Sequence, residues 1–164
     1  MATLAAGFPA KVGYMALTEL RNHRFTQGLD ESHLAKLARL ATEVNFIEDE
    51  LILVDGQRST SFYLLLSGSV AVELRTGSFA VCVEALGPGQ VFGWSSLLDR
   101  QDTLFQVRAR EKTTALRLSG PDLQATCKSD TILGAEILHR TLQVVAGRVK
   151  ATEIRFAEMC GVKI

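Results

Sequence analysis

A short segment around Gly93 has the residue types of a turn that holds a small anion. Gly93 is followed by Ser95 and Ser96 in a run that can begin a helix, and helix-start N–H groups attract an oxyanion. Such a turn normally places a carboxylate and an arginine beside the anion. Here Trp94 stands where the carboxylate would lie, and Thr103 stands near where the arginine would lie. The segment therefore predicts anion recognition with weakened charge pairing.

Two features of this segment leave alternatives open. Trp94 either stacks on a flat ligand or fills the site as part of the core, which is the commoner fate of a single tryptophan. Ser95 and Ser96 either offer hydroxyls to an anion or cap the short helix. One alternative for each residue is a role in ligand binding and the other is a structural role, and neither requires catalysis.

Other site chemistries are poorly supported. A metal site on a β-fold needs clustered histidines on strands, whereas His23, His33 and His139 fall in segments that we predict to be helical. The sequence GWSSL lacks the closing glycine of a nucleophile elbow, and Walker and Rossmann glycine patterns are absent. We therefore predict that the chain is not an enzyme.

The composition is that of an ordinary globular protein. The 164 residues are 47% hydrophobic and 22% charged, which predicts one domain or one domain with a long helix. A net charge of zero disfavours nucleic-acid binding. Three scattered cysteines indicate a reducing cytoplasm, because no CxxC pair is present. No apolar run is long enough for a membrane span. The apolar patch at the N-terminus is not preceded by a charged region, so we do not expect a signal peptide.

The elements divide into three segments. Helices are predicted within 1–43: a short turn over 18–24, and a helix through Thr42 that Asp30 can cap. Residues 44–118 change to short alternating segments with glycine turns, which predict an antiparallel sandwich or barrel. Those strand segments are 50–54, 62–66, 70–74, 79–83, 104–109 and 114–118. Helices return over 119–164, where Ser119 and Asp122 have the spacing of a capping box.

The last helix, from about residue 130 to 159, has the most regular apolar pattern of the chain. Its seam residues repeat at intervals of 4 and 3, as in a coiled coil, and they are Leu138, Leu142, Val145, Val149, Thr152, Phe156 and Met159. A seam of this length favours pairing of two helices in a homodimer. The alternative is that the helix packs on its own domain. In a parallel pair, Arg148 of one chain can meet Glu153 of the other.

The order of helices, β-segments and long helix resembles the cyclic-nucleotide-binding domain of the Crp/Fnr (catabolite activator) regulators. The resemblance rests on FYLLLSGSVAVEL, LGPGQVFGWSSLL, and VRA followed by LRLSGPDL. It implies an α+β fold, an antiparallel β-roll (a jelly-roll-like double-stranded β-helix) flanked by N-terminal helices and a long C-terminal dimerisation helix. It also implies a non-enzymatic regulatory module that senses a cyclic nucleotide.

The resemblance also implies where the ligand would bind. The family pattern has a glutamate directly after the glycine and an arginine six residues before the alanine of VRA. Trp94 and Thr103 occupy these two positions, and the cassette is about one residue shorter. Losing two charge-assisted partners costs about 3–6 kcal/mol, so cAMP or cGMP, or another small anionic ligand, is expected to bind weakly. The ligand residues that we expect are Val72, Val83, Gly93, Trp94, Ser95, Ser96, Thr103, Leu104, Arg148 and Thr152.

Two arginines are considered as replacements for the missing cation. Arg100 lies in the turn and can fold over the site, whereas strand alternation places Arg108 on the face opposite Val107.

On the last helix, Thr152 is expected near the mouth of the pocket. The chain ends at Ile164 with no room for a helix-turn-helix, so we expect no DNA binding. The alternative function is a dimeric protein-interaction scaffold that has lost nucleotide binding.

Overall fold

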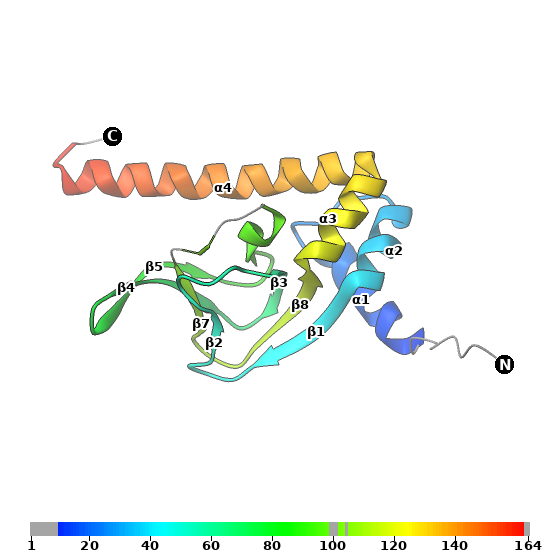
Figure 1. The fold of residues 1–164 in the computed structure, drawn as a ribbon, viewed down its shortest axis with the longest axis horizontal. Helices are drawn as coiled ribbons and strands as arrows, with labels where there is room; N and C mark the ends of the chain where they lie inside the picture. Colours follow the sequence, from blue (N-terminus) through cyan, green and yellow to red (C-terminus); the bar gives the residue numbers. More distant parts are fainter. Residues whose placement is uncertain (1–9, 99–101, 104, 163–164) are drawn as a thin grey trace. The chain divides into compact units, whose positions relative to one another are not determined.

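The computed structural model describes residues 10–98, 102–103 and 105–162, and Figure 1 shows its elements in chain order. The helices are α1 (Ala10–Asn22), α2 (Glu31–Leu40), the 3-10 helix η1 (Trp94–Leu97), α3 (Gly120–Ser129) and α4 (Thr131–Met159). The strands are β1 (Ala41–Phe46), β2 (Leu51–Leu53), β3 (Ser61–Ser67), β4 (Val70–Thr76), β5 (Phe79–Leu86), β6 (Val91–Phe92), β7 (Gln106–Ala109) and β8 (Thr113–Ser119).

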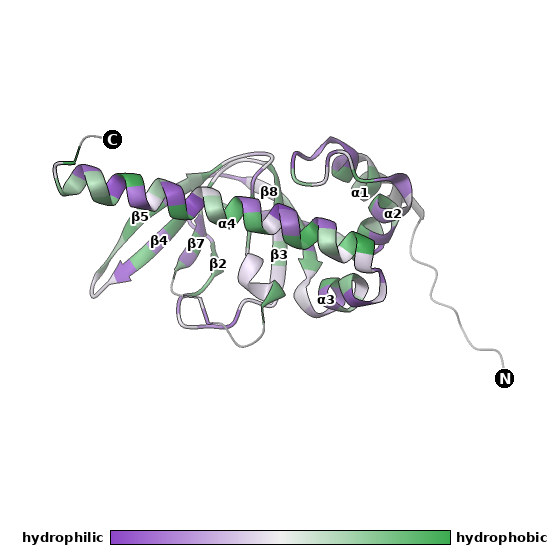
Figure 2. Cartoon of the chain, turned by 90° about the horizontal axis from the view of Figure 1, so that it is seen from above, coloured by the Kyte–Doolittle hydropathy of each residue, from purple (hydrophilic) through white to green (hydrophobic). Residues whose placement is uncertain are grey.

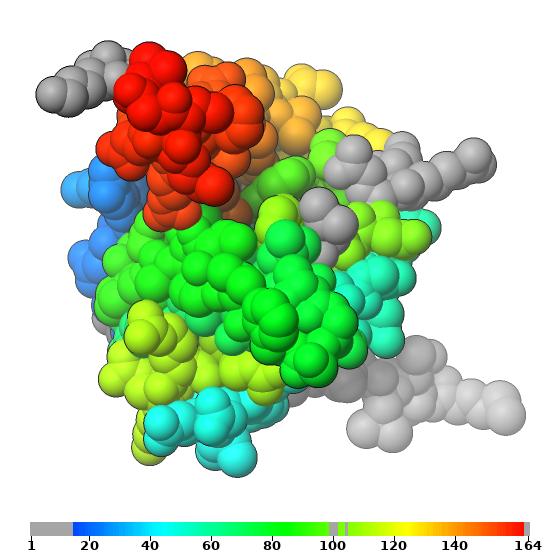
Figure 3. Space-filling view, turned by 90° about the vertical axis from the view of Figure 1, so that its left-hand side faces the viewer, coloured from blue at the N-terminus to red at the C-terminus, as the bar shows by residue number. Residues whose placement is uncertain are grey.

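The strands form two four-stranded antiparallel sheets, which together make a β-roll. One sheet has the order β1-β8-β3-β6, and the other has the order β2-β7-β4-β5. Segments of the second sheet lie side by side on the face shown in Figure 3, with the β4–β5 hairpin in green. The predicted antiparallel α+β fold is therefore confirmed. The chain divides into one compact unit that ends at Thr126 and a second that begins at Cys127.

An apolar cluster fills the roll because alternate residues of both sheets point inward. Tyr63 stacks on Phe92 with ring centroids 4.7 Å apart, and Phe46 meets Tyr63 edge-on at 6.2 Å. Strand β3 is buried on both faces, since Phe62 on its other face contacts Phe25 of the N-terminal segment. The buried members of the cluster are Tyr63, Leu65, Val70, Val72, Leu86, Phe92, Val107 and Ala115.

The helices begin at the predicted caps, but two boundaries differ from the prediction. The Asp30 carboxylate accepts a hydrogen bond from the backbone N–H of His33 at 2.9 Å and so begins α2. Helix α2 ends at Leu40, not beyond Thr42, because Ala41 already pairs with Leu118 of β8. Helix α1 begins at residue 10, earlier than the short turn predicted from residue 18.

The C-terminal helices agree with their predictions. The Asp122 N–H donates to the Ser119 hydroxyl at 3.4 Å at the start of α3. Asp130 caps α4 by accepting from the N–H of Leu133 at 3.0 Å, and the helix continues without a break to Met159. Within the described residues, no helix is both long and apolar enough to cross a membrane.

The ring of His23 makes two hydrogen bonds, one of which joins the N-terminal segment to strand β3 of the roll. It lies directly after α1 rather than within a helix, and its ring is 5% exposed. The Phe25 N–H donates to Nδ1 at 3.1 Å, so Nδ1 carries no proton. Nε2 lies 3.1 Å from the Leu65 carbonyl oxygen and therefore donates to it. Burial lowers the pKa of His23, in line with a neutral ring that is fixed in one tautomer.

We expect the free energy of unfolding to fall as the pH is lowered from about 7 to about 5. The unfolded chain takes up a proton on His23 below its ordinary pKa of 6.5, whereas the folded chain resists it, so acid favours unfolding. Urea unfolding at several pH values measures this slope. His23→Gln should flatten it, and His139→Gln, at an exposed position of α4, should not. Equal slopes for His23→Gln and the unmodified protein would contradict this role of His23.

Candidate functional site

The corner that follows β6 depends on glycine at position 93. Gly93 has a φ of +75°, in the left-handed region that other residues rarely adopt. A Cβ there would overlap the Ser61 carbonyl oxygen and come within 3.2 Å of a Tyr63 ring carbon. The corner is thus packed directly on the first residues of β3, and η1 begins immediately after it.

Helix η1 is held between the beginning of β3 and the beginning of α3. The Ser96 carbonyl accepts a hydrogen bond from the Gln124 side chain at 2.8 Å. The Gly120 N–H donates to the Thr60 carbonyl at 2.8 Å, and a Cβ on Gly120 would lie 2.8 Å from the Cβ of Ser96. Helix η1 is thus held to α3 by the Gln124 side chain and by the close approach of Gly120 to Ser96, and Gly120 is in turn bonded to the residue before β3.

The two serines of η1 do not cap it. Its N-cap is Gly93, with no side-chain capping bond. The Ser96 hydroxyl is buried and has no hydrogen-bond partner among the described residues, while Ser95 is half-buried. Trp94 is also half-buried and lies outside the apolar cluster of the roll. The capping alternative is therefore wrong, and part of the indole stays accessible.

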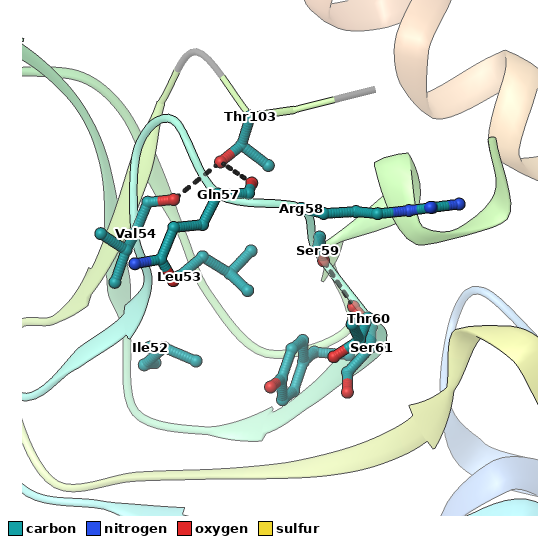
Figure 4. A pocket seen from close by; sticks show the side chains of 10 residues that line it. Ile52, Leu53, Val54, Gln57, Arg58, Ser59, Thr60, Ser61 and Thr103 are labelled. Atoms are coloured by element: carbon teal, nitrogen blue, oxygen red, sulfur yellow. Dashed lines mark hydrogen bonds between the residues drawn. The ribbon is translucent and has the colours of Figure 1, made fainter. Parts of the chain in front are cut away.

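The side chain of Thr103 is engaged with the turn that follows β2. Its hydroxyl oxygen lies 2.9 Å from the Val54 carbonyl oxygen and 3.1 Å from that of Gln57, and it donates to them (Figure 4). The backbone adds two bonds, from the Gly56 N–H to the Thr103 carbonyl at 2.7 Å and from the Thr103 N–H to the Gln57 carbonyl at 3.1 Å. Thr103 thus stabilises a turn and supplies no cation.

Arg108 is engaged on the outer face of the second sheet. Its Nε lies 3.2 Å from a Glu73 carboxylate oxygen, and its guanidinium also donates to the Asp49 carbonyl at 2.9 Å. The same Glu73 oxygen accepts from the Gln106 amide at 2.6 Å, while Val107 between them points into the roll. The predicted strand alternation is confirmed, and Arg108 does not replace the missing cation.

The other expected ligand residues lie in three places. Val72 and Val83 belong to the apolar interior, Val72 buried and Val83 half-buried against the cluster. Thr152 donates to the Arg148 carbonyl at 2.9 Å in the unit that begins at Cys127, and the approach of both to the pocket stays a prediction. Leu104 and the candidate Arg100 lie outside the described residues.

A cavity of about 170 Å³ lies beside Thr103, at the turn between β2 and β3. Figure 4 shows its lining side chains, which come from β2, this turn, the beginning of β3 and Thr103. Among the described residues, no group of three or more His, Cys, Asp or Glu could hold a metal ion there or elsewhere. Those lining residues are Ile52, Leu53, Val54, Gln57, Arg58, Ser59, Thr60, Ser61, Tyr63 and Thr103.

Sequence reasoning found Thr103 but missed the other polar residues of this cavity. Arg58, Ser59 and Ser61 lie in a polar stretch that reads locally as an ordinary turn. Their placement depends on pairing between Arg58 and Asp102, which are far apart in the chain. A local pattern carries no signal for such a pairing.

Comparisons with known proteins agree on one family. The family described as cyclic nucleotide-binding domain matches residues 43–130. Potassium channel AKT1 of Oryza sativa subsp. indica is 27% identical over 154 residues, which are 88% of this chain and 16% of that protein. The chain spans only 11–16% of such curated relatives.

Solved structures share the fold. A putative cyclic nucleotide-binding protein from Geobacter metallireducens GS-15 has a TM-score of 0.72 and 25% identity, covering 82% of this chain and 98% of that one. The regulatory subunit of a cAMP-independent protein kinase A from Trypanosoma cruzi, bound to guanosine, has a TM-score of 0.66 and 19% identity. That match covers 84% of this chain and 50% of the kinase subunit.

Replacing Thr103 by Val should destabilise the fold by about 1 kcal/mol, because the hydroxyl's hydrogen bonding to the turn is lost at nearly constant shape. Urea unfolding measures the change. Thr76→Val is the matched control, since the Thr76 hydroxyl makes only a long, exposed contact of 3.4 Å with the Phe79 carbonyl. Equal stabilities of the two variants would show that the Thr103 hydroxyl does not hold the turn.

Proposed function

Because the chain belongs to the cyclic nucleotide-binding domain family, we propose that it is a regulatory ligand-sensing module with an atypical phosphate-binding cassette. One observation carries the proposal: the Thr103 hydroxyl is engaged with the turn at Val54 and Gln57, at the position where the family resemblance calls for an arginine. The module senses a ligand without catalysing a reaction.

The ligand proposed is a cyclic nucleotide, cAMP or cGMP, bound weakly, or another small anion of similar shape. The half-buried Trp94 would stack on a base, and Val72 and Val83 would form an apolar wall. Gly93, Ser95, Ser96, Thr103 and Leu104 would surround the phosphate, and Arg148 and Thr152 of α4 would cover the base. Ligand binding would shift the population between two packings of α4.

The Trypanosoma cruzi neighbour also supports an atypical ligand. Its description as the subunit of a cAMP-independent kinase, bound to guanosine, concerns a protein of the same fold that takes a nucleoside without a phosphate. Binding tests of this chain should therefore include guanosine as well as the cyclic nucleotides.

Calorimetry should show that cAMP binds with a Kd weaker than about 100 μM, near −5.5 kcal/mol, because two charge-assisted partners of the phosphate are absent. Replacing Trp94 by Glu and Thr103 by Arg together should tighten binding by at least about tenfold. The paired variant Trp94→Gln with Thr103→Gln, which adds no charge, is the control. A Kd near 1 μM for the unmodified protein would contradict the proposed weak cassette.

We also propose a homodimer through α4. The large apolar residues of the seam are exposed: Leu142 is 64% exposed, Phe156 67% and Met159 85%. Figure 2 shows green apolar positions recurring along the helix between purple polar ones. An exposed apolar strip of this length on a helix is stabilised by pairing with a second helix. In the parallel arrangement, Arg148 and Glu153 of the two chains would set the register.

Replacing Val149 and Phe156 by Glu should convert the dimer to a monomer, because carboxylates of both chains would face each other across the seam. Light scattering at tens of micromolar protein gives the molar mass. Glu substitutions at Lys150 and Ala157, outside the seam on the same helix, form the control and should leave the dimer intact. A monomeric unmodified protein would show that α4 does not pair.

The alternative function is a dimeric protein-interaction scaffold without nucleotide binding. It shares the exposed α4 seam and differs in the roll, where no nucleotide, nucleoside or anion would bind. A cytoplasmic location and the lack of DNA binding by this chain also remain predictions, which rest on the cysteine content and the zero net charge.

A further inference from the structure

We infer that Arg58, on the turn between β2 and β3, supplies the positive charge that binds the phosphate group of the ligand. This inference rests on the proposed function and names the cation of the same site. It is carried by the cavity that Arg58 and Thr103 line together.

The backbone places Arg58 beside Thr103, the position where the family pattern has an arginine. Arg58 pairs with Asp102 in an isolated antiparallel bridge, one residue before Thr103. The hydrogen bonds of Thr103 to Val54, Gly56 and Gln57 hold the same turn from the other side. The Arg58 side chain, directly after Gln57, is therefore carried by a backbone that is held in place beside Thr103. It can replace the missing arginine although it belongs to a different segment of the chain.

The residues that follow Arg58 connect the cavity to the Gly93 corner. Ser61 and Tyr63 line the cavity, and they are the residues against which Gly93 packs. Ser61 and Tyr63 thus connect the cavity beside Thr103 with the corner at Gly93. The other polar groups that the described residues contribute are neutral, with the Ser59 hydroxyl donating to the Ser61 carbonyl at 3.1 Å. Among the described residues that line the cavity, Arg58 is the one with a charged side chain.

The guanidinium of Arg58 is available for a ligand. Its side chain is exposed, extends from the turn on the side opposite Val54 (Figure 4), and makes no hydrogen bond or ion pair with any described residue. Arg75 and Arg108, by contrast, face Asp55 and Glu73. Asp102 is also exposed, but it makes no ion pair with Arg58. An unpaired arginine at the rim of a polar cavity is suited to a bidentate contact with phosphate oxygens.

The size of the cavity matches part of a ligand. Cavities that enclose a whole drug-sized molecule measure about 300–1,000 Å³, and this one measures about 170 Å³. It therefore accommodates a phosphate group rather than a whole nucleotide. The chemistry recognised is that of a phosphate oxyanion, either free or as part of a nucleotide.

The experiment follows the side-chain Nε–H resonance of Arg58 by NMR while inorganic phosphate, cAMP or adenosine is added to the full chain. Phosphate and cAMP should shift this resonance, and adenosine should not. Arg58→Gln should weaken cAMP binding by at least about tenfold, the loss expected for a charge-assisted contact. Arg110→Gln removes the same charge at an exposed turn outside the cavity and should leave binding unchanged.

The outcomes separate this inference from the proposed function. If cAMP binds the unmodified protein and Arg58→Gln equally well, the module stands and the role of Arg58 is overturned. If phosphate binds through Arg58 while cAMP does not bind, the anion site stands and the cyclic-nucleotide function fails. If neither phosphate nor cAMP binds the unmodified protein, both are overturned. Thermal unfolding of Arg58→Gln without ligand checks that the variant is folded.

Discussion

The close approach of two glycines to the beginning of β3 is the constraint on which the rest of the site depends. A side chain on Gly93 would overlap the Ser61 carbonyl oxygen, and one on Gly120 would overlap Ser96. These contacts bring the corner after β6, helix η1 and the first turn of α3 onto one short stretch of backbone. That stretch continues back into the turn that carries Arg58, so four distant segments meet there without a charged core residue.

The charges of the roll are arranged so that the fold does not need its ligand. An arginine inside the cassette would have to be desolvated and would lack a partner whenever the ligand is absent, which is costly. Thr103 avoids this cost, because its hydroxyl is satisfied by the Val54 and Gln57 carbonyls. Arg58 remains in water at the rim and loses little hydration in the empty state. In the proposed site, Thr103 therefore favours stability of the unliganded fold over affinity for an anion.

The sequence predicts the fold well where the pattern is local. The Asp30 cap and the alternation of Val107 and Arg108 both appear as expected, because each depends on neighbours within one element. Strand β1 was missed because only pairing with β8 turns Ala41–Phe46, a weakly apolar segment, into a strand. Arg58 was missed for the same reason, since its place beside Thr103 comes from pairing across more than forty residues.

The same contacts link the turn of Arg58 and helix η1 to the beginning of α3. Arg58 is followed by Thr60, whose carbonyl accepts from the N–H of Gly120, the first residue of α3. Gln124, one turn further along α3, donates to Ser96 of η1. The turn and η1 are thus both hydrogen-bonded to α3, which α4 follows in the chain. Such a chain of contacts transmits a signal only if the ligand binds two arrangements of it with different affinity, because a coupling free energy is a difference between states.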